Sequence, residues 1–111
     1  MIESISMGKL LFKGKVSRSD TIVYPDKMDT KWWIASRTCI EPGDLESVIS
    51  FEPEVVIVGT GFMMPISISD SAIESLKSAG IEVFVEKAEP AAEIYNEQAS
   101  KKKTVGLFHL L

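Results

Sequence analysis

Residues 54–61 read Glu-Val-Val-Ile-Val-Gly-Thr-Gly, and this segment constrains the fold more than any other. Val55 to Val58 are all β-branched and apolar, so the predicted strand has no polar face. A strand that is apolar at every position is covered on both sides, which is typical of layered α/β domains. Gly59 and Gly61 then permit a tight turn at the carboxyl end of the strand, where open α/β sheets place their ligands.

Helices are predicted on either side of this strand. The first begins at Pro42 and ends before Pro53, because proline fits a first helical turn and disfavours helix in the residue that precedes it. The second covers residues 70–79 and stops at Gly80. The third begins near Pro90 and packs through its alanines.

Shorter runs rich in β-branched and aromatic residues predict the remaining strands, which are residues 9–12, 21–24, 32–35, 81–85 and 104–109. Alternation in 81–85 indicates a less buried strand, which forms a βαβ unit with strand 54–58 and helix 70–79. We therefore expect one α/β domain over residues 1–111. It has three layers, with a central mixed, partly parallel sheet covered by helices and extra β-structure at the N-terminus.

The composition limits what the chain binds. Its net charge of −4 opposes the counterion release that drives binding to DNA and RNA, so we expect no nucleic-acid partner. The one basic run, residues 101–103, is predicted to be a solvated turn.

Cys39 is the only cysteine, which excludes an internal disulfide and a zinc site built on several cysteines. No apolar run reaches the roughly 18 residues that span a bilayer. The first residues also lack the basic and apolar regions of a signal peptide. We expect a cytoplasmic protein without membrane insertion, bound metal or cofactor.

The first candidate ligand site is Gly59-Thr60-Gly61. A glycine turn after a strand can present backbone N–H groups to an anion. The third glycine of a dinucleotide-binding motif and the Gly-Lys-Ser/Thr of a P-loop are both missing. The turn is therefore either a small-ligand or anion site, or simply a turn that must be tight.

Tyr95 and Asn96 on the third helix are the other candidate ligand residues. An asparagine inside a helix needs a partner for its amide, which is either the backbone of a neighbouring loop or a ligand. Tyr95 is predicted to lie in the core with its hydroxyl at the rim.

A candidate partner surface is formed by large apolar residues outside the clear periodic elements, namely Trp32, Trp33, Phe62, Met63 and Met64. In a strand, the two tryptophans point to opposite faces, so one of them is left at the surface. Exposed aromatic and methionine side chains are typical of protein contacts, with a second copy of this chain among the alternatives. The other interpretation is that they cap the edge of the sheet.

Catalytic groups are scarce. His109 is the only histidine and is predicted to be a surface or packing residue. A dyad of Cys39 with His109 is chemically allowed, but nothing in the sequence brings the two together. We therefore assign no catalytic residue.

The order of motifs resembles the small MTH-like domain family. The likeness runs nearly end to end, through the motifs Asp20-Thr-Ile-Val, Asp44-Leu45, Val56-Ile-Val-Gly-Thr-Gly, Ala91-x-x-x-Tyr-Asn and Gly106-Leu-Phe-His. That family includes an adipogenesis-associated protein and a mitochondrial assembly factor of NADH:ubiquinone oxidoreductase. The resemblance implies a compact α/β domain to which no catalytic activity is attached.

Two functions follow as hypotheses. The first is a non-enzymatic binding or assembly module with an unidentified protein partner. The alternative is a small-ligand or anion-binding protein, or a weak enzyme, with its site at the Gly59-Thr60-Gly61 turn.

Overall fold

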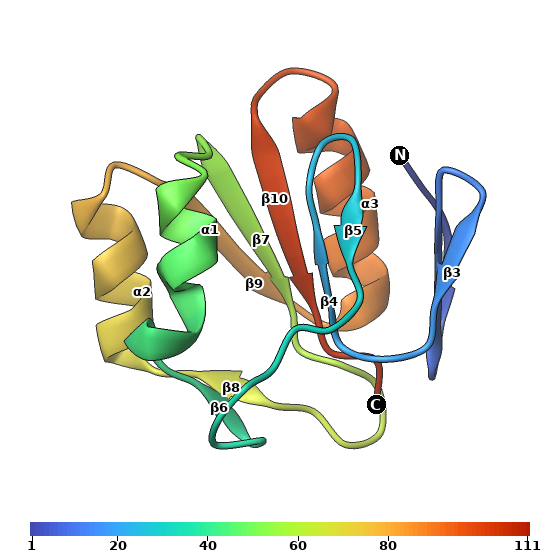
Figure 1. Ribbon diagram of the computed structural model, residues 1–111, viewed down its shortest axis with the longest axis horizontal. Coiled ribbons are helices and arrows are strands. Elements are labelled where there is room, and N and C mark those ends of the chain that lie inside the picture. The colour runs from blue at the N-terminus through green and yellow to red at the C-terminus, as the bar shows by residue number, and fades with distance from the viewer.

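A mixed sheet of five strands lies at the centre of the computed structural model, which describes residues 1–111 (Figure 1). The strand order is β5 (Met28–Asp29), β4 (Thr21–Val23), β10 (Thr104–Phe108), β7 (Val55–Gly59) and β9 (Glu82–Glu86). Strands β10, β7 and β9 are parallel, whereas β4 and β5 pair antiparallel at one side. The predicted α/β class and mixed sheet are confirmed.

Strand β7 is buried on both faces, as its sequence predicted. Val56 and Val58 belong to a core of 15 buried residues on one face of the sheet. Val55 and Ile57 belong to a second core of 11 buried residues on the other face. Because β7 lies between β10 and β9, its backbone is paired on both edges as well.

Helices cover the two faces (Figure 1). On one side lie the short 3₁₀ helix η1 (Pro42–Leu45), which runs directly into α1 (Glu46–Ser50), and α2 (Asp70–Ser78), whose N-cap is Ser69. On the other side lies α3 (Ala88–Ala99), which begins two positions before Pro90, with Lys87 as N-cap. None of these helices combines the length and apolar character that a membrane crossing requires.

Two smaller sheets complete the fold. Strands β1 (Ile2–Ser6), β2 (Lys9–Phe12) and β3 (Lys15–Ser17) form an antiparallel sheet beside α3, which is the predicted N-terminal β-structure (Figure 1). Strands β6 (Cys39–Ile40) and β8 (Ser67–Ile68) pair in parallel.

The predicted strand at residues 32–35 is wrong. This segment is an irregular connection between β5 and β6. Asp44 holds it against η1, because its side chain accepts a hydrogen bond from Ala35 N–H at 3.2 Å and its carbonyl accepts one from Trp32 Nε1 at 3.3 Å. These tertiary contacts outweigh the high β-propensity of the tryptophans.

Candidate functional site

The backbone of the Gly59-Thr60-Gly61 turn is largely committed to the fold. Thr60 N–H donates to the carbonyl of Glu86 at 2.9 Å, and the carbonyl of Gly59 accepts from His109 N–H at 3.0 Å. The carbonyl of Gly61 accepts from Ala88 N–H at 3.2 Å, at the start of α3. These bonds tie the turn to β9, α3 and the end of β10.

The two glycines serve different purposes. Gly61 has φ +117°, which L side chains rarely adopt. Gly59 has no left-handed backbone, but a Cβ there would lie 2.7 Å from the ring of Phe108. Gly59 therefore permits close packing across the sheet, and only Gly61 is required by backbone conformation.

Replacing Gly61 by alanine is expected to destabilise the protein by about 1 kcal/mol or more, since the backbone is incompatible with a side chain. The new Cβ would also lie 2.7 Å from His109 Cδ2 and 3.3 Å from the backbone of Leu111. Denaturant titration measures the loss, and Gly43→Ala is the control because nothing lies within 4 Å of a Cβ at that position. Equal stability of the two variants would contradict the strain assigned to Gly61.

Tyr95 is deeper in the core than predicted. Its side chain is 1% exposed, and its hydroxyl donates to the carbonyl of Tyr24 at 2.9 Å instead of reaching the rim. Burial raises the pKa of the Tyr95 hydroxyl, and the negative charge of Asp26 raises it further. The hydroxyl therefore stays protonated and acts as a structural donor between α3 and the end of β4.

Asn96 joins α3 to the N-terminal sheet. Its Oδ1 accepts from Ile2 N–H at 2.7 Å, and its Nδ2 donates to the carbonyl of Ile2 at 2.9 Å. The amide is thus paired with the backbone of a strand, not of a loop. Neither Asn96 nor Tyr95 lies with the Gly59–Gly61 turn in any of the main hollows of the surface.

Truncating Asn96 to alanine is expected to lower the free energy of unfolding by about 1–3 kcal/mol, because both backbone groups of Ile2 lose their partner. Thermal or denaturant unfolding measures the loss, with the exposed neighbour Glu97→Ala as control. An Asn96→Ala protein that melts like the wild type would instead favour a ligand contact for this residue.

The main cleft of the molecule lies beside the carboxyl ends of β7 and β10 and encloses about 850 Å³. We call it the Trp33 cleft; it is lined by residues 18–20, 32–34, 37–38, 64–66 and 109–111. Open α/β sheets usually place their ligand sites at the carboxyl ends of parallel strands. The lining includes three residues of the predicted partner surface, Trp32, Trp33 and Met64, and no residue of the predicted ligand turn.

The candidate partner residues divide between two hollows. Trp33 and Met64 are 70% and 69% exposed and line the Trp33 cleft, where Trp32 contributes a side chain that is only 9% exposed. Phe62 and Met63 line a separate hollow of about 360 Å³ near the start of α3. The structure therefore brings three of the five residues together.

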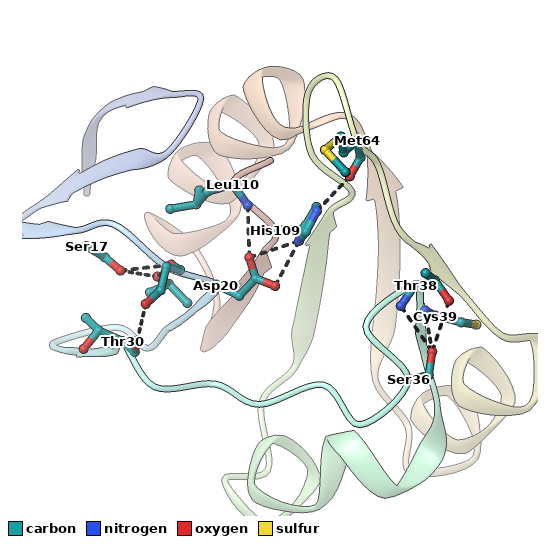
Figure 2. Close-up of polar contacts among 11 residues, drawn as sticks. Ser17, Asp20, Thr30, Ser36, Thr38, Cys39, Met64, His109 and Leu110 are labelled. Atoms are coloured by element: carbon teal, nitrogen blue, oxygen red, sulfur yellow. Dashed lines mark hydrogen bonds and ion pairs between the residues drawn. The ribbon is translucent and has the colours of Figure 1, made fainter.

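Asp20 and His109 brace one wall of the cleft (Figure 2). The Asp20 carboxylate lies 2.9 and 3.0 Å from His109 Nδ1, and one of its oxygens also accepts from Leu110 N–H at 3.2 Å. On the far side of the ring, Nε2 lies 2.8 Å from the carbonyl of Met64. Both ring nitrogens thus face acceptors, and His109, 8% exposed, is buried, in line with the packing role, one of the two roles that the sequence left open.

Sequence reasoning missed the two arginines of the cleft, Arg18 and Arg37. The chain contains only these two arginines, and both line the cleft with the two tryptophans and the single histidine. Arg37 lies over the ring of Trp33, with its guanidinium carbon 5.7 Å from the ring centroid. One feature of the sequence could have indicated them. The chain has ten lysines but only two arginines, and one arginine precedes β4 while the other follows β5.

The cleft is suited to binding. Its arginine side chains can pair with a charged group, while its tryptophan and methionine side chains offer apolar surface. Cys39 does not line it, so the structure does not bring the candidate dyad of Cys39 with His109 into this cleft. No three acidic, histidine or cysteine side chains gather in a geometry that would hold a metal ion.

Solved structures with the same fold cover almost the whole chain. The conserved hypothetical protein PH1505 from Pyrococcus horikoshii OT3 is 21% identical, with a TM-score of 0.87 over 99% of this chain and 98% of its own. The protein MT938 is 19% identical, with a TM-score of 0.80 over 99% and 96%. A protein from Bartonella henselae described as an outer membrane protein is 19% identical, with a TM-score of 0.70 over 98% and 92%.

The family is given by a sequence model that matches residues 2–110. That model describes a protein of unknown function, DUF498/DUF598. The similarity covers every element of the structure from β1 to β10, so the chain belongs to the DUF498/DUF598 family.

Proposed function

We propose that this chain is a non-enzymatic binding module that takes part in protein assembly, and that its partner docks at the Trp33 cleft. One observation carries the proposal: both tryptophans, both arginines and the only histidine line a single open cleft. Tryptophan and arginine are the residues that most often dominate binding energy at protein interfaces. Exposed methionine, here Met64, is enriched at such surfaces as well.

The groups with catalytic potential are occupied in ways that favour a binding role. His109 uses both ring nitrogens to join Asp20 to the carbonyl of Met64. The hydroxyl of Tyr95 is buried and bonded. The resemblance to the MTH-like domain family, which includes an assembly factor, supports the same proposal. We further propose that the protein is cytoplasmic, because a single cysteine is consistent with a reducing compartment.

A tagged protein purified from its native cell tests this function. We expect a protein partner to co-purify with the wild type. The amount of this partner is expected to fall at least about tenfold with Trp33→Ala, the effect of losing an interface hot spot. Because the Trp33 side chain is 70% exposed, its removal is expected to change stability by less than about 0.5 kcal/mol. Val85→Ala, an exposed apolar position on β9, is the control.

Mass spectrometry of the purified material separates the outcomes. A partner that Trp33→Ala and Val85→Ala retain equally would show that docking occurs elsewhere on the molecule. If the only protein that co-purifies is a second copy of this chain, self-association replaces the proposed assembly role.

Small-ligand binding is the second candidate function, and the place and size of the cleft favour it. Ligand pockets of α/β folds lie at the carboxyl ends of the strands and typically measure about 300–1,000 Å³. The Trp33 cleft, of about 850 Å³, meets both criteria. A small molecule that co-purifies with the wild type and is lost with Trp33→Ala, in the absence of any protein, would put this candidate first.

A further inference from the structure

The two arginines of the Trp33 cleft carry charges that the molecule itself does not neutralise. The ion pairs of the structure join Lys102 to Glu82 and His109 to Asp20, and neither involves Arg18 or Arg37. Asp20 is the only acidic residue that lines the cleft, and its carboxylate is already shared between His109 and Leu110. The cleft therefore holds two guanidinium groups that form no ion pair within the molecule.

Arg37 is held in place by its own turn. Its φ is +65°, an uncommon conformation for a residue other than glycine, and such strain is often found at binding sites. Arg37 N–H donates to the carbonyl of Ile34 at 3.2 Å, and Ser36 Oγ accepts from the N–H groups of Thr38 and Cys39 at 3.2 and 2.9 Å (Figure 2). The turn thus presents the guanidinium beside the ring of Trp33.

No helix begins at a residue that lines the cleft. Four of its backbone N–H groups, those of Met64, Ile66, His109 and Leu110, already donate to acceptors inside the molecule. Phosphate sites usually add a helix N-terminus or a row of backbone N–H groups to their basic side chains. Two planar guanidinium groups without a helix N-terminus match a carboxylate, which arginine binds through paired hydrogen bonds.

The rest of the lining is apolar. Trp33 and Met64 are exposed, whereas the other apolar lining residues Ile34, Ile66 and Leu110 are buried. A ligand that contacts both the arginines and the apolar side chains of the cleft therefore has a carboxylate on one side and a large apolar group on the other. Glutamate or aspartate next to leucine or phenylalanine in a protein segment has this chemistry.

We propose that the Trp33 cleft binds an acidic, apolar segment of the partner protein, with Arg18 and Arg37 binding a carboxylate and Trp33 packing against the adjacent apolar side chain. This inference rests on the proposed function and adds the chemistry of the partner to it. The docked segment is thus recognised by charge and by apolar contact together, and neither alone is sufficient.

A matched set of peptides tests the proposal. The probe is acetyl-Leu-Glu-Phe-Leu-amide, compared with the Gln-for-Glu peptide, which lacks the charge, and with acetyl-Gly-Glu-Gly-Gly-amide, which lacks the apolar body. Both tryptophans of the chain line the cleft, so tryptophan fluorescence and the indole NMR signals report directly on binding there. The probe is expected to bind at least about tenfold more tightly than either control peptide, a difference of about 1.4 kcal/mol.

Variants of the chain test whether Arg18 and Arg37 bind the carboxylate of the probe. Arg18→Gln and Arg37→Gln are each expected to weaken binding of the probe about fivefold or more, while leaving the Gln-for-Glu peptide unaffected. Lys77→Gln, which removes a basic residue of α2 outside the cleft, is the matched control and is expected to change nothing. Equal affinity for the Glu and Gln peptides overturns the proposal. Unchanged affinity of the Arg18→Gln/Arg37→Gln double variant for the probe also overturns it, and so does the absence of binding at millimolar probe concentration.

Two further ligands separate the sources of the anion. If free 4-phenylbutyrate binds as tightly as the peptide, the occupant is a small acid and the proposed protein segment is wrong. If inorganic phosphate displaces the probe at lower concentration than acetate does, the carboxylate assignment is wrong. Loss of the cellular partner with Trp33→Ala, combined with equal binding of the Glu and Gln peptides, would refute this inference and leave the proposed function standing.

Discussion

Truncating Ile57 to alanine is expected to lower the free energy of unfolding by roughly 2–5 kcal/mol, the range for deletion of a fully buried isoleucine side chain. Ile57 is 0% exposed at the middle of β7 and faces the core beneath α3. Its strand is paired on both edges, so the surroundings cannot collapse into the cavity without disturbing β10 or β9. Denaturant titration of the two proteins measures the loss.

A pair of valines provides the control for that experiment. Val58 of β7 and Val85 of β9 are partners in the sheet register, but Val58 is 0% exposed and Val85 is 39% exposed. The same chemical change, valine to alanine, is therefore expected to cost at least about 1 kcal/mol more at Val58 than at Val85. A loss below about 1 kcal/mol for Ile57→Ala would mean that β7 is not the centre of the core.

The central strand could be predicted because its evidence is local. Four adjacent β-branched apolar residues have one common explanation, burial on both faces, and Val55 to Val58 divide between the two cores accordingly. The alternation in residues 81–85 likewise indicated a less buried strand, and β9, at the edge of the sheet, has no fully buried residue. In each of these segments the hydrophobic pattern and the tertiary environment agree, so the pattern alone was sufficient.

The segment at Trp32 and Trp33 shows where local evidence fails. Its β-propensity is high, yet its conformation is set by hydrogen bonds to Asp44, which lies 12 positions after Trp32. The expected division of the two side chains survives, since Trp32 is buried and Trp33 exposed, but a strand is not its cause. Hydrogen bonds between distant residues leave no periodic signal in a sequence.

The sequence placed its candidate ligand site at the Gly59-Thr60-Gly61 turn, whereas none of these residues lines the main cleft. His109, the residue that follows β10, does line it. The lining, however, comes from connections near residues 18, 33, 37, 64 and 109, which are brought together only by the complete fold. Asp20 and His109 are 89 positions apart, so neither residue alone suggested the contact.

Replacing Asp20 by alanine is expected to destabilise the protein by about 2–3 kcal/mol, the cost of removing a charged acceptor from partly buried donors. The change leaves His109 Nδ1 and Leu110 N–H without their acceptor. Loss of a fully buried ion pair costs about 3–5 kcal/mol, but the Asp20 side chain is 25% exposed, so water offsets part of the loss. Chemical denaturation measures the difference, and Asp26→Ala, an exposed aspartate beyond the other end of β4, is the control.

Asp20→Asn separates the charge from the hydrogen bonds. The amide oxygen can still accept from His109 or Leu110 N–H, so we expect about half the destabilisation of Asp20→Ala. Because His109 also holds the carbonyl of Met64, loosening the ring is expected to shift the indole NMR signal of Trp33 across the cleft. If Asp20→Ala and Asp26→Ala unfold at the same denaturant concentration and that signal stays in place, the wall of the cleft does not depend on the Asp20–His109 contact. The backbone bonds of Met63 and Met64 to Leu111, and of Ile66 to Thr60, then support the segment around residues 64–66.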